Sequence, residues 1–97
     1  MKIIALEEEL PGKRGTDFTP HLQAEAAAVW QLQQAGSLRE IYFDSRQHTA
    51  VLILEVENLE QAQTLLDSLP LVQAGLIRFK LIPLQPYDGF QRLFAKP

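Results

Sequence analysis

The sequence contains no cysteine. Disulfides, thiolate catalysis, iron–sulfur clusters and cysteine-ligated zinc are therefore excluded. The 2 histidines lack the helical His-to-His spacing of a metal site, so we expect no metal. Positive charge is also scarce, because 9 Lys and Arg stand against 12 Asp and Glu for a net charge of -3. This balance offers no electrostatic reason to bind nucleic acid.

Long hydrophobic runs are missing as well. The longest, residues 50–54 and 69–72, fall far short of the roughly 20 residues that cross a bilayer. The apolar stretch after Met1 is too short for a signal-peptide core and has no small-residue cleavage site. We therefore expect a cytoplasmic chain without a membrane partner.

What is present suits a single domain over residues 1–97, with 46% hydrophobic and 22% charged residues. The apolar pattern predicts helices over residues 19–36 and 59–69 and strands over 2–7, 38–43, 50–56 and 76–84. Thr19 before Pro20 is the expected N-cap of the first helix, and Gly36 its left-handed C-terminal cap. Asn58 and Gln61 resemble a capping box for the second helix.

Two βαβ units with right-handed crossovers, offset by one strand, predict an α+β domain of the ferredoxin-like βαββαβ type. Its four-stranded antiparallel sheet has the order 4-1-3-2, with both helices on one face. Strand alternation assigns to the helix-covered face Ile4, Leu6, Ile41, Phe43, Leu52, Leu54, Val56, Ile77, Phe79 and Leu81. The opposite face receives Ile3, Ala5, Val51, Ile53, Leu76 and Ile82, ringed by Glu7, Glu40, Tyr42, Glu55, Arg78 and Lys80.

The two central strands are thus apolar on both faces, unlike strands with one face in water. A second layer must cover the open face, and a homodimer that pairs sheet to sheet would supply it. The C-terminal tail, residues 86–97, carries Tyr87, Phe90, Leu93 and Phe94. We expect it to dock on the body or on the partner. The alternative is that the tail alone covers the open face.

Two segments carry a resemblance to a known family: Leu32-Gln33-Gln34-Ala35-Gly36-Ser37-Leu38-Arg39 and Leu69-Pro70-Leu71. With the chain length and the element order, they resemble the dimeric α+β barrel superfamily and, within it, the muconolactone isomerase-like proteins. The resemblance implies protomers that pair sheet to sheet, can assemble further, and hold a pocket that works without a metal or organic cofactor. The YCII-like proteins are a more distant comparison, which implies a histidine–aspartate pair as the site.

The topology brings four segments to one edge of the sheet: the end of the first strand, the start of the first helix, the hairpin over residues 44–48 and the start of the fourth strand. Their polar residues offer a base, an acid and cations for a carboxylate or an enolate. We assign catalysis to His21, His48, Tyr42 and Glu7, and substrate binding to Arg39, Arg78, Arg14 and Asp17. For Arg39 a cross-strand or intersubunit ion pair is an equal alternative.

The other candidates have structural alternatives too. His21 follows Asp17 at the spacing of a surface pair, and His48 closes a hairpin, where histidines are mostly solvated. Glu7 and Arg78 are expected side by side on the open face, where the favoured interpretation is an ion pair at the margin of the dimer.

The leading hypothesis is a small-molecule-binding homodimer of the muconolactone isomerase-like type, a cofactor-independent isomerase or lyase acting on a small carboxylated or lactone substrate. The alternative is a non-enzymatic binding or assembly module whose cleft is filled by its own tail. An enclosed pocket with polar walls would favour the first, and a closed apolar interface the second. The sequence leaves open whether the protein is an enzyme.

Overall fold

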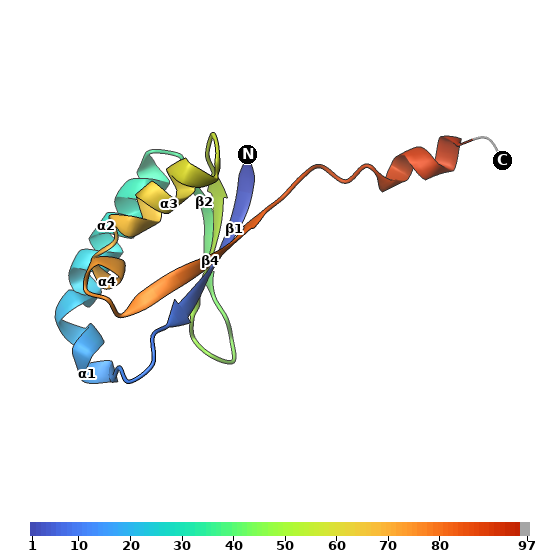
Figure 1. Cartoon of the computed structure of the whole chain (residues 1–97). Helices are drawn as coiled ribbons and strands as arrows, with labels where there is room; N and C mark the ends of the chain where they lie inside the picture. Colours follow the sequence, from blue (N-terminus) through green and yellow to red (C-terminus); the bar gives the residue numbers. More distant parts are fainter. Residues whose placement is uncertain (96–97) are drawn as a thin grey trace.

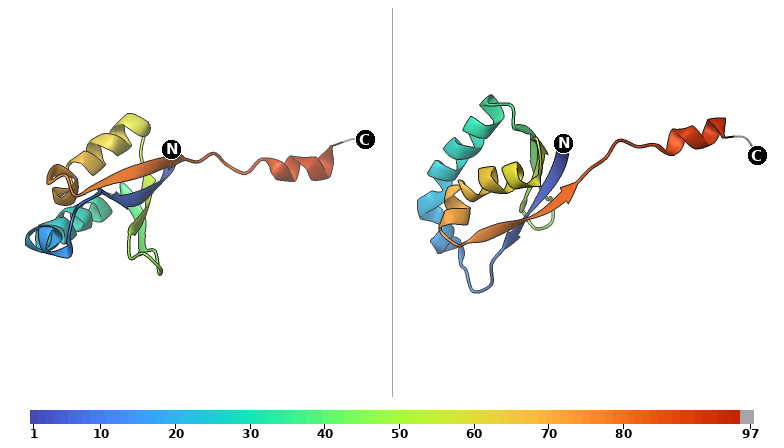
Figure 2. Two further views of the ribbon diagram at one scale, coloured as in Figure 1. Left: turned by 60° about the horizontal axis from the view of Figure 1, so that its bottom comes forward. Right: turned by 45° about the horizontal axis from the view of Figure 1, so that its top comes forward.

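The computed structural model describes residues 1–95. Its elements are, in chain order, β1 (Lys2–Glu9), α1 (Gly15–Phe18), η1 (Thr19–His21), α2 (Leu22–Gln34), β2 (Leu38–Phe43), β3 (Ala50–Glu55), α3 (Leu59–Asp67), α4 (Pro70–Gln73), β4 (Ile77–Pro83) and η2 (Gly89–Phe94). The strands form one antiparallel sheet of order β2-β3-β1-β4, the predicted order read from the other edge. The helices of the body cover one face of this sheet (Figures 1 and 2). The expected ferredoxin-like architecture is confirmed.

The core lies between the sheet and the helix layer. Ile3 of β1 pairs with Leu54 of β3, and Ala5 pairs with Leu52. Residues directly opposite each other in an antiparallel pair point to the same face, so all four side chains share one side. They are buried in a cluster with Leu66 of α3. Burying such a leucine fully stabilises the fold by roughly 1.5–3 kcal/mol.

This register corrects the predicted orientation of β1. We expected Ile4 and Leu6 to face the helices, and Ile3 and Ala5 to lie on the open face; the structure shows the reverse. All four residues are apolar, so alternation within β1 alone cannot choose a face, and the pairing with β3 decides it. The consequence for function is that Glu7 lies on the helix side. Leu76, also assigned to the open face, is instead buried just before β4 begins.

The entry to the first long helix also differs from the prediction. Thr19 is not an N-cap: its Oγ1 donates to the carbonyl of Gly15 at 3.1 Å, inside a short turn that precedes α2. The helical path begins at Gly15, where the backbone N–H of Arg14 donates to Asp17 Oδ2 at 2.8 Å. Gly36 has the expected left-handed conformation after α2, with φ of 85°.

The second long helix begins as expected. Asn58 Oδ1 accepts from the backbone N–H of Gln61 at 2.7 Å, which confirms the N-cap. The returning bond differs slightly, because Gln61 Oε1 accepts from the backbone N–H of Glu57 at 2.6 Å and not from that of Asn58. The helix is also shorter than predicted, and Pro70 begins a separate turn, α4.

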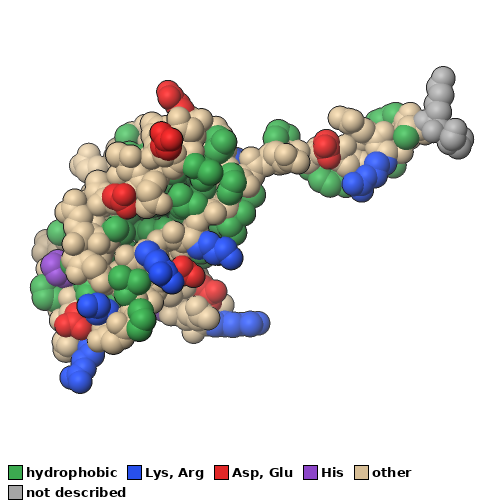
Figure 3. All heavy atoms as spheres, in the orientation of Figure 1, with side chains coloured by type: hydrophobic (Ala, Val, Ile, Leu, Met, Phe, Trp, Pro, Cys, Tyr) green, Lys and Arg blue, Asp and Glu red, His purple; other side chains and the backbone are tan. Residues whose placement is uncertain are grey.

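The chain leaves the body after β4. Figures 1 and 2 show residues 86–95, here called the C-terminal arm, extending away from the sheet and the helices. Figure 3 shows apolar side chains distributed along the arm. The arm makes the molecule 60 Å long and only 29 by 21 Å across. Its aromatic side chains are exposed, and Phe94 most of all at 83%. Docking of the arm on a partner stays a prediction; residues 96 and 97 of the expected tail lie outside the described residues.

Candidate functional site

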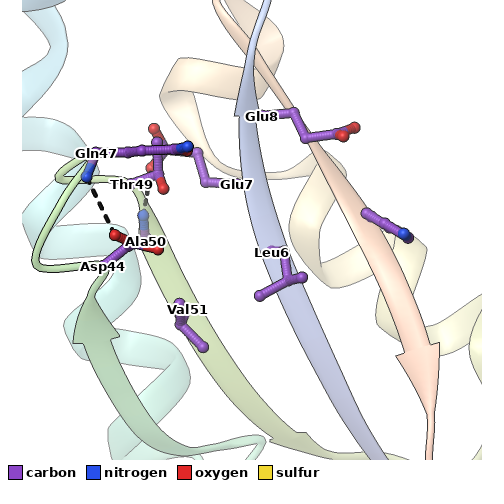
Figure 4. A pocket seen from close by; sticks show the side chains of 9 residues that line it. Leu6, Glu7, Glu8, Asp44, Gln47, Thr49, Ala50 and Val51 are labelled. Atoms are coloured by element: carbon purple, nitrogen blue, oxygen red, sulfur yellow. Dashed lines mark hydrogen bonds between the residues drawn. The ribbon is translucent and has the colours of Figure 1, made fainter.

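Glu7 is the polar residue that the fold places most unusually. It lies near the end of β1 on the helix side, half-buried, and its Oε1 accepts from the backbone N–H of Ala50 at 3.1 Å (Figure 4). Burial raises the pKa of the Glu7 carboxyl; the bond from Ala50 opposes this shift, the charge of Glu9 adds to it, and that of His48 opposes it. The net direction is upward, as expected of a carboxyl used for proton transfer.

His48 lies on the hairpin between β2 and β3, close enough for its charge to act on Glu7. Asp44 shapes this hairpin: its Oδ1 accepts from the backbone N–H groups of Arg46 and Gln47 at 2.7 and 3.1 Å, which lowers the pKa of the Asp44 carboxyl. His48 then adopts φ of 56°, a conformation that costs a non-glycine residue about 1 kcal/mol. Its ring stacks on Phe43, with centroids 4.0 Å apart.

Glu7 and His48 line the same hollow, which we call the Glu7 cleft. It has a volume of about 300 Å³ and is lined by Glu7, Glu9, Phe18, Leu22, Phe43, His48 and Leu71. A carboxyl with a raised pKa and an imidazole therefore share one largely apolar cavity. Such a pair can abstract a proton and stabilise the resulting oxyanion.

A second hollow lies beside the first, between α2 and β2. This hollow, the Trp30 groove, has a volume of about 320 Å³ and is lined by Leu22, Glu25, Ala26, Val29, Trp30, Gln33, Ile41, Phe43 and Ala50. Leu22 and Phe43 line both hollows, so the two are neighbours. Trp30 is 57% exposed and Phe43 60% exposed, which leaves two aromatic side chains open to an apolar occupant.

Glu25 is a site residue that the sequence interpretation missed. It lies in the first turn of α2, and its Oε1 accepts from the backbone N–H of Leu71 at 2.9 Å. Burial raises the pKa of Glu25, the bond from Leu71 opposes the shift, and repulsion from Glu7 adds to it. One signal was available: Glu25 lies three residues after Leu22 and four before Val29, on the apolar side of the helix.

The remaining candidates do not gather around Glu7 and His48. Tyr42 is exposed on the open face, where its hydroxyl donates to Glu40 Oε1 at 2.6 Å, and this bond raises the pKa of Tyr42. Arg39 Nε donates to the carbonyl of Gly36 at 2.7 Å. Arg39 does not line the Glu7 cleft, and it forms no cross-strand ion pair within residues 1–95. Tyr42 and Glu7 lie on opposite faces of the sheet. The two residues therefore cannot act together in catalysis as we had expected.

The expected pairs are also rearranged. Asp17 caps α1 through the N–H of Arg14, and no ion pair between Asp17 and His21 occurs within residues 1–95. His21 lies just before α2 but lines neither hollow. The expected contact of Glu7 with Arg78 is wrong, because β1 is turned over: Arg78 Nε lies 3.2 Å from Glu8 Oε1.

The open face of the sheet is a second candidate surface. Its middle consists of the half-buried side chains Ile4, Leu6, Val51, Ile53 and Ile82. Charged and polar groups surround them, including the Glu8–Arg78 and Glu40–Tyr42 pairs. Figure 4 shows Leu6 and Val51 side by side at a hollow of about 270 Å³ near the hairpin. Apart from Glu7, the predicted ring of polar residues lies where we expected it.

Among residues 1–95, no three His, Asp or Glu side chains are grouped to hold a metal ion. No helix there is long and apolar enough to cross a membrane.

Comparison by sequence gave no match to a protein-family model or to a curated protein. Comparison by structure gave matches over most of the chain. The 5-chloro-2-hydroxyhydroquinone dehydrochlorinase of Burkholderia phenoliruptrix AC1100, solved with 2,5-dihydroxybenzoquinone, is 14% identical and has a TM-score of 0.70, with 92% of this chain and 98% of that chain covered. Muconolactone isomerase is 18% identical and has a TM-score of 0.75, with 91% and 92% covered. The expected likeness to muconolactone isomerase is confirmed at the level of the fold.

Proposed function

We propose that the protein binds a small, neutral ring compound in the Glu7 cleft and moves a proton on it, working as a homodimer and without a cofactor. The observation that supports this most is Glu7 itself: a half-buried carboxyl with a raised pKa, beside an imidazole, in a largely apolar hollow. A raised pKa makes a carboxylate a better base, and one close to the working pH allows the acid form to return the proton.

The charge of the cleft bears on the substrate class. Glu7 and Glu9 line it, Glu25 lies next to it, and no Lys or Arg of residues 1–95 is among its lining residues. The carboxylates around the cleft repel an anion inside it, so a carboxylated substrate is disfavoured. Of the two kinds of substrate that the sequence led us to expect, a lactone is therefore better supported than a carboxylated compound. The two structural neighbours agree with a small ring, since one is named for a lactone and the other was solved with a benzoquinone.

The proposed reaction follows from the two groups. Glu7 takes a proton from the carbon next to a carbonyl, so that the C–H electron pair enters the ring and the carbonyl oxygen becomes an enolate. His48 donates a hydrogen bond to that oxygen. Glu7 then returns the proton at another carbon, and the double bond has moved with no net change in atoms or electrons.

Deuterium exchange tests the proposal without a known substrate. The wild type, Glu7→Gln and Glu8→Gln are incubated in D₂O with unsaturated lactones and cyclic enones, and ¹H NMR follows the loss of the proton next to the carbonyl. We expect the wild type to exchange at least one compound and Glu7→Gln to be slower by about 10²–10⁴-fold. Glu8→Gln is the matched control, because Glu8 points to the other face. Equal rates for the wild type and Glu7→Gln, or no exchange above the solvent rate, would contradict the proposal.

The homodimer is proposed to form through the open face. Five apolar side chains there have no covering layer within residues 1–95, whereas burial against a second sheet would remove them from water. The rim around them includes both Glu8 and Arg78, so a two-fold arrangement can pair opposite charges across the interface.

A further inference from the structure

We infer that the C-terminal arm of one copy docks into the Trp30 groove of a second copy. This step depends on the second copy included in the proposed function but on different residues from the proposed reaction. Each copy inserts its arm into the groove of the other copy and receives the other copy's arm in its own groove. The two contacts are therefore equivalent, and both are made within one symmetric dimer.

The arm is locally ordered by contacts among its own residues, and its apolar side chains remain exposed. The rings of Tyr87 and Phe90 meet edge to face, with centroids 4.9 Å apart. The Tyr87 ring lies over Gly89, in the space that a Cβ on this residue would need. The arm therefore holds a local shape while Phe90, Leu93 and Phe94 remain in water. A preformed segment loses less conformational entropy when it binds.

The Trp30 groove can bury the apolar side chains that the arm leaves in water. Its lining is predominantly apolar, with Trp30 and Phe43 more than half exposed, and its volume of about 320 Å³ suits side chains of this size. Aromatic residues that meet in such a site contribute both buried area and favourable ring geometry.

Charge favours the groove over the open face as the docking surface. Among residues 1–95, Glu25 is the only acidic or basic residue that lines the groove, and the arm brings Arg92 in the last turn of η2. The half-buried carboxylate of Glu25 would gain a cation, while Asp88 lies at the other end of η2. The open face also carries carboxylates, but Glu8 already pairs with Arg78 and Glu55 with the N-terminal amine. Arg92 would therefore gain less there.

The arm is poorly placed to reach the groove of its own copy. It leaves from β4, at the edge of the sheet opposite to β2. The first residue beyond β4, Leu84, donates its N–H to the carbonyl of Lys2, at the end of the sheet far from the Glu7 cleft. Figures 1 and 2 show that the arm then continues away from the helix layer. A second copy is the occupant that this geometry favours.

Trp30 allows a direct test because it is the only tryptophan in the chain. A reporter chain carries Phe90→Asp and Phe94→Asp, which make its own arm polar, and keeps Trp30. A donor chain carries Trp30→Phe, which removes its fluorescence, and keeps the native arm. Iodide quenching of Trp30 is measured for the reporter alone and after mixing and equilibration with an excess of donor.

We expect the quenching constant of the reporter to fall roughly two-fold on mixing, because a docked arm excludes water and iodide from Trp30. A donor with Gln91→Asp should act like the native donor, while one with the two Phe→Asp changes should not. An unchanged quenching constant would overturn the inference. The wild type diluted until sedimentation shows monomers gives a second test. If iodide quenched its Trp30 as weakly as in the dimer, the arm of the same copy would cover Trp30, and the inference would be overturned. Neither result depends on the deuterium-exchange assay.

Discussion

The ring of His48 stacks on that of Phe43 at 4.0 Å and 19°, although His48 must adopt a left-handed backbone to do so. The hairpin that imposes this conformation therefore also fixes the imidazole in the lining of the Glu7 cleft. Strain of this kind persists only where the surrounding structure holds it in place. Here the Asp44 bonds hold it.

Substitution of His48 by valine should destabilise the fold, because a β-branched residue tolerates a positive φ worst and the stacking with Phe43 is lost. We expect the free energy of unfolding to fall by about 1–3 kcal/mol, measured by urea denaturation. Gln47→Val, one residue earlier and without a positive φ, is the control and should change it by less than about 0.5 kcal/mol. Equal effects of the two changes would show that the left-handed position is not strained.

The raised pKa values of Glu7 and Glu25 predict a pH dependence of stability. Both carboxyls titrate at higher pH in the folded chain than in the unfolded chain, so the folded state binds more protons between the two pKa values. The free energy of unfolding should therefore decrease as the pH rises from below 4.5 through the folded pKa of each group. Glu7→Gln and Glu25→Gln should each flatten this decrease.

Urea midpoints between pH 4 and 8 measure this effect. Glu8→Gln is the control, because the Glu8 side chain is exposed beside Arg78, and its profile should follow the wild type. If the Glu7→Gln profile also followed the wild type, burial of the Glu7 carboxylate would carry no penalty.

Ile53→Asp tests the open face. Ile53 lies in the middle of that face, opposite Ile4, and a carboxylate there would be buried in a sheet-to-sheet dimer. We expect the wild type to sediment as a dimer and the folded variant as a monomer. If both were folded monomers, or both the same dimer, the interface would lie elsewhere. Circular dichroism of the variant checks that its fold is intact.

The cap of α3 gives a local test of stability. Asn58→Ala removes the bond from the Gln61 N–H and should lower the free energy of unfolding by about 0.5–2 kcal/mol in urea denaturation. Glu57→Ala is the control, since the bond at Glu57 uses its backbone N–H and survives the change. A smaller loss for Asn58→Ala than for Glu57→Ala would exclude the cap as a source of stability.

The sequence by itself determined the order of the elements, the cap at Asn58 and the turn at Gly36. These features depend on local chemistry or on the succession of apolar segments, and both are visible in one dimension. The separation of Glu7 from Tyr42 was not visible in this way. β1 is apolar at successive positions, so either face of it could meet the helices.

Only the tertiary structure decided that question. Pairing of Ile3 with Leu54 turns β1 so that Glu7 enters the cleft and Glu8 meets Arg78. The same packing brings Leu71 to Glu25, two residues 46 positions apart in the chain, and so makes a helix-surface glutamate part of the site. Contacts of this range depend on how layers pack, because a one-residue change of register exchanges the two faces of a strand.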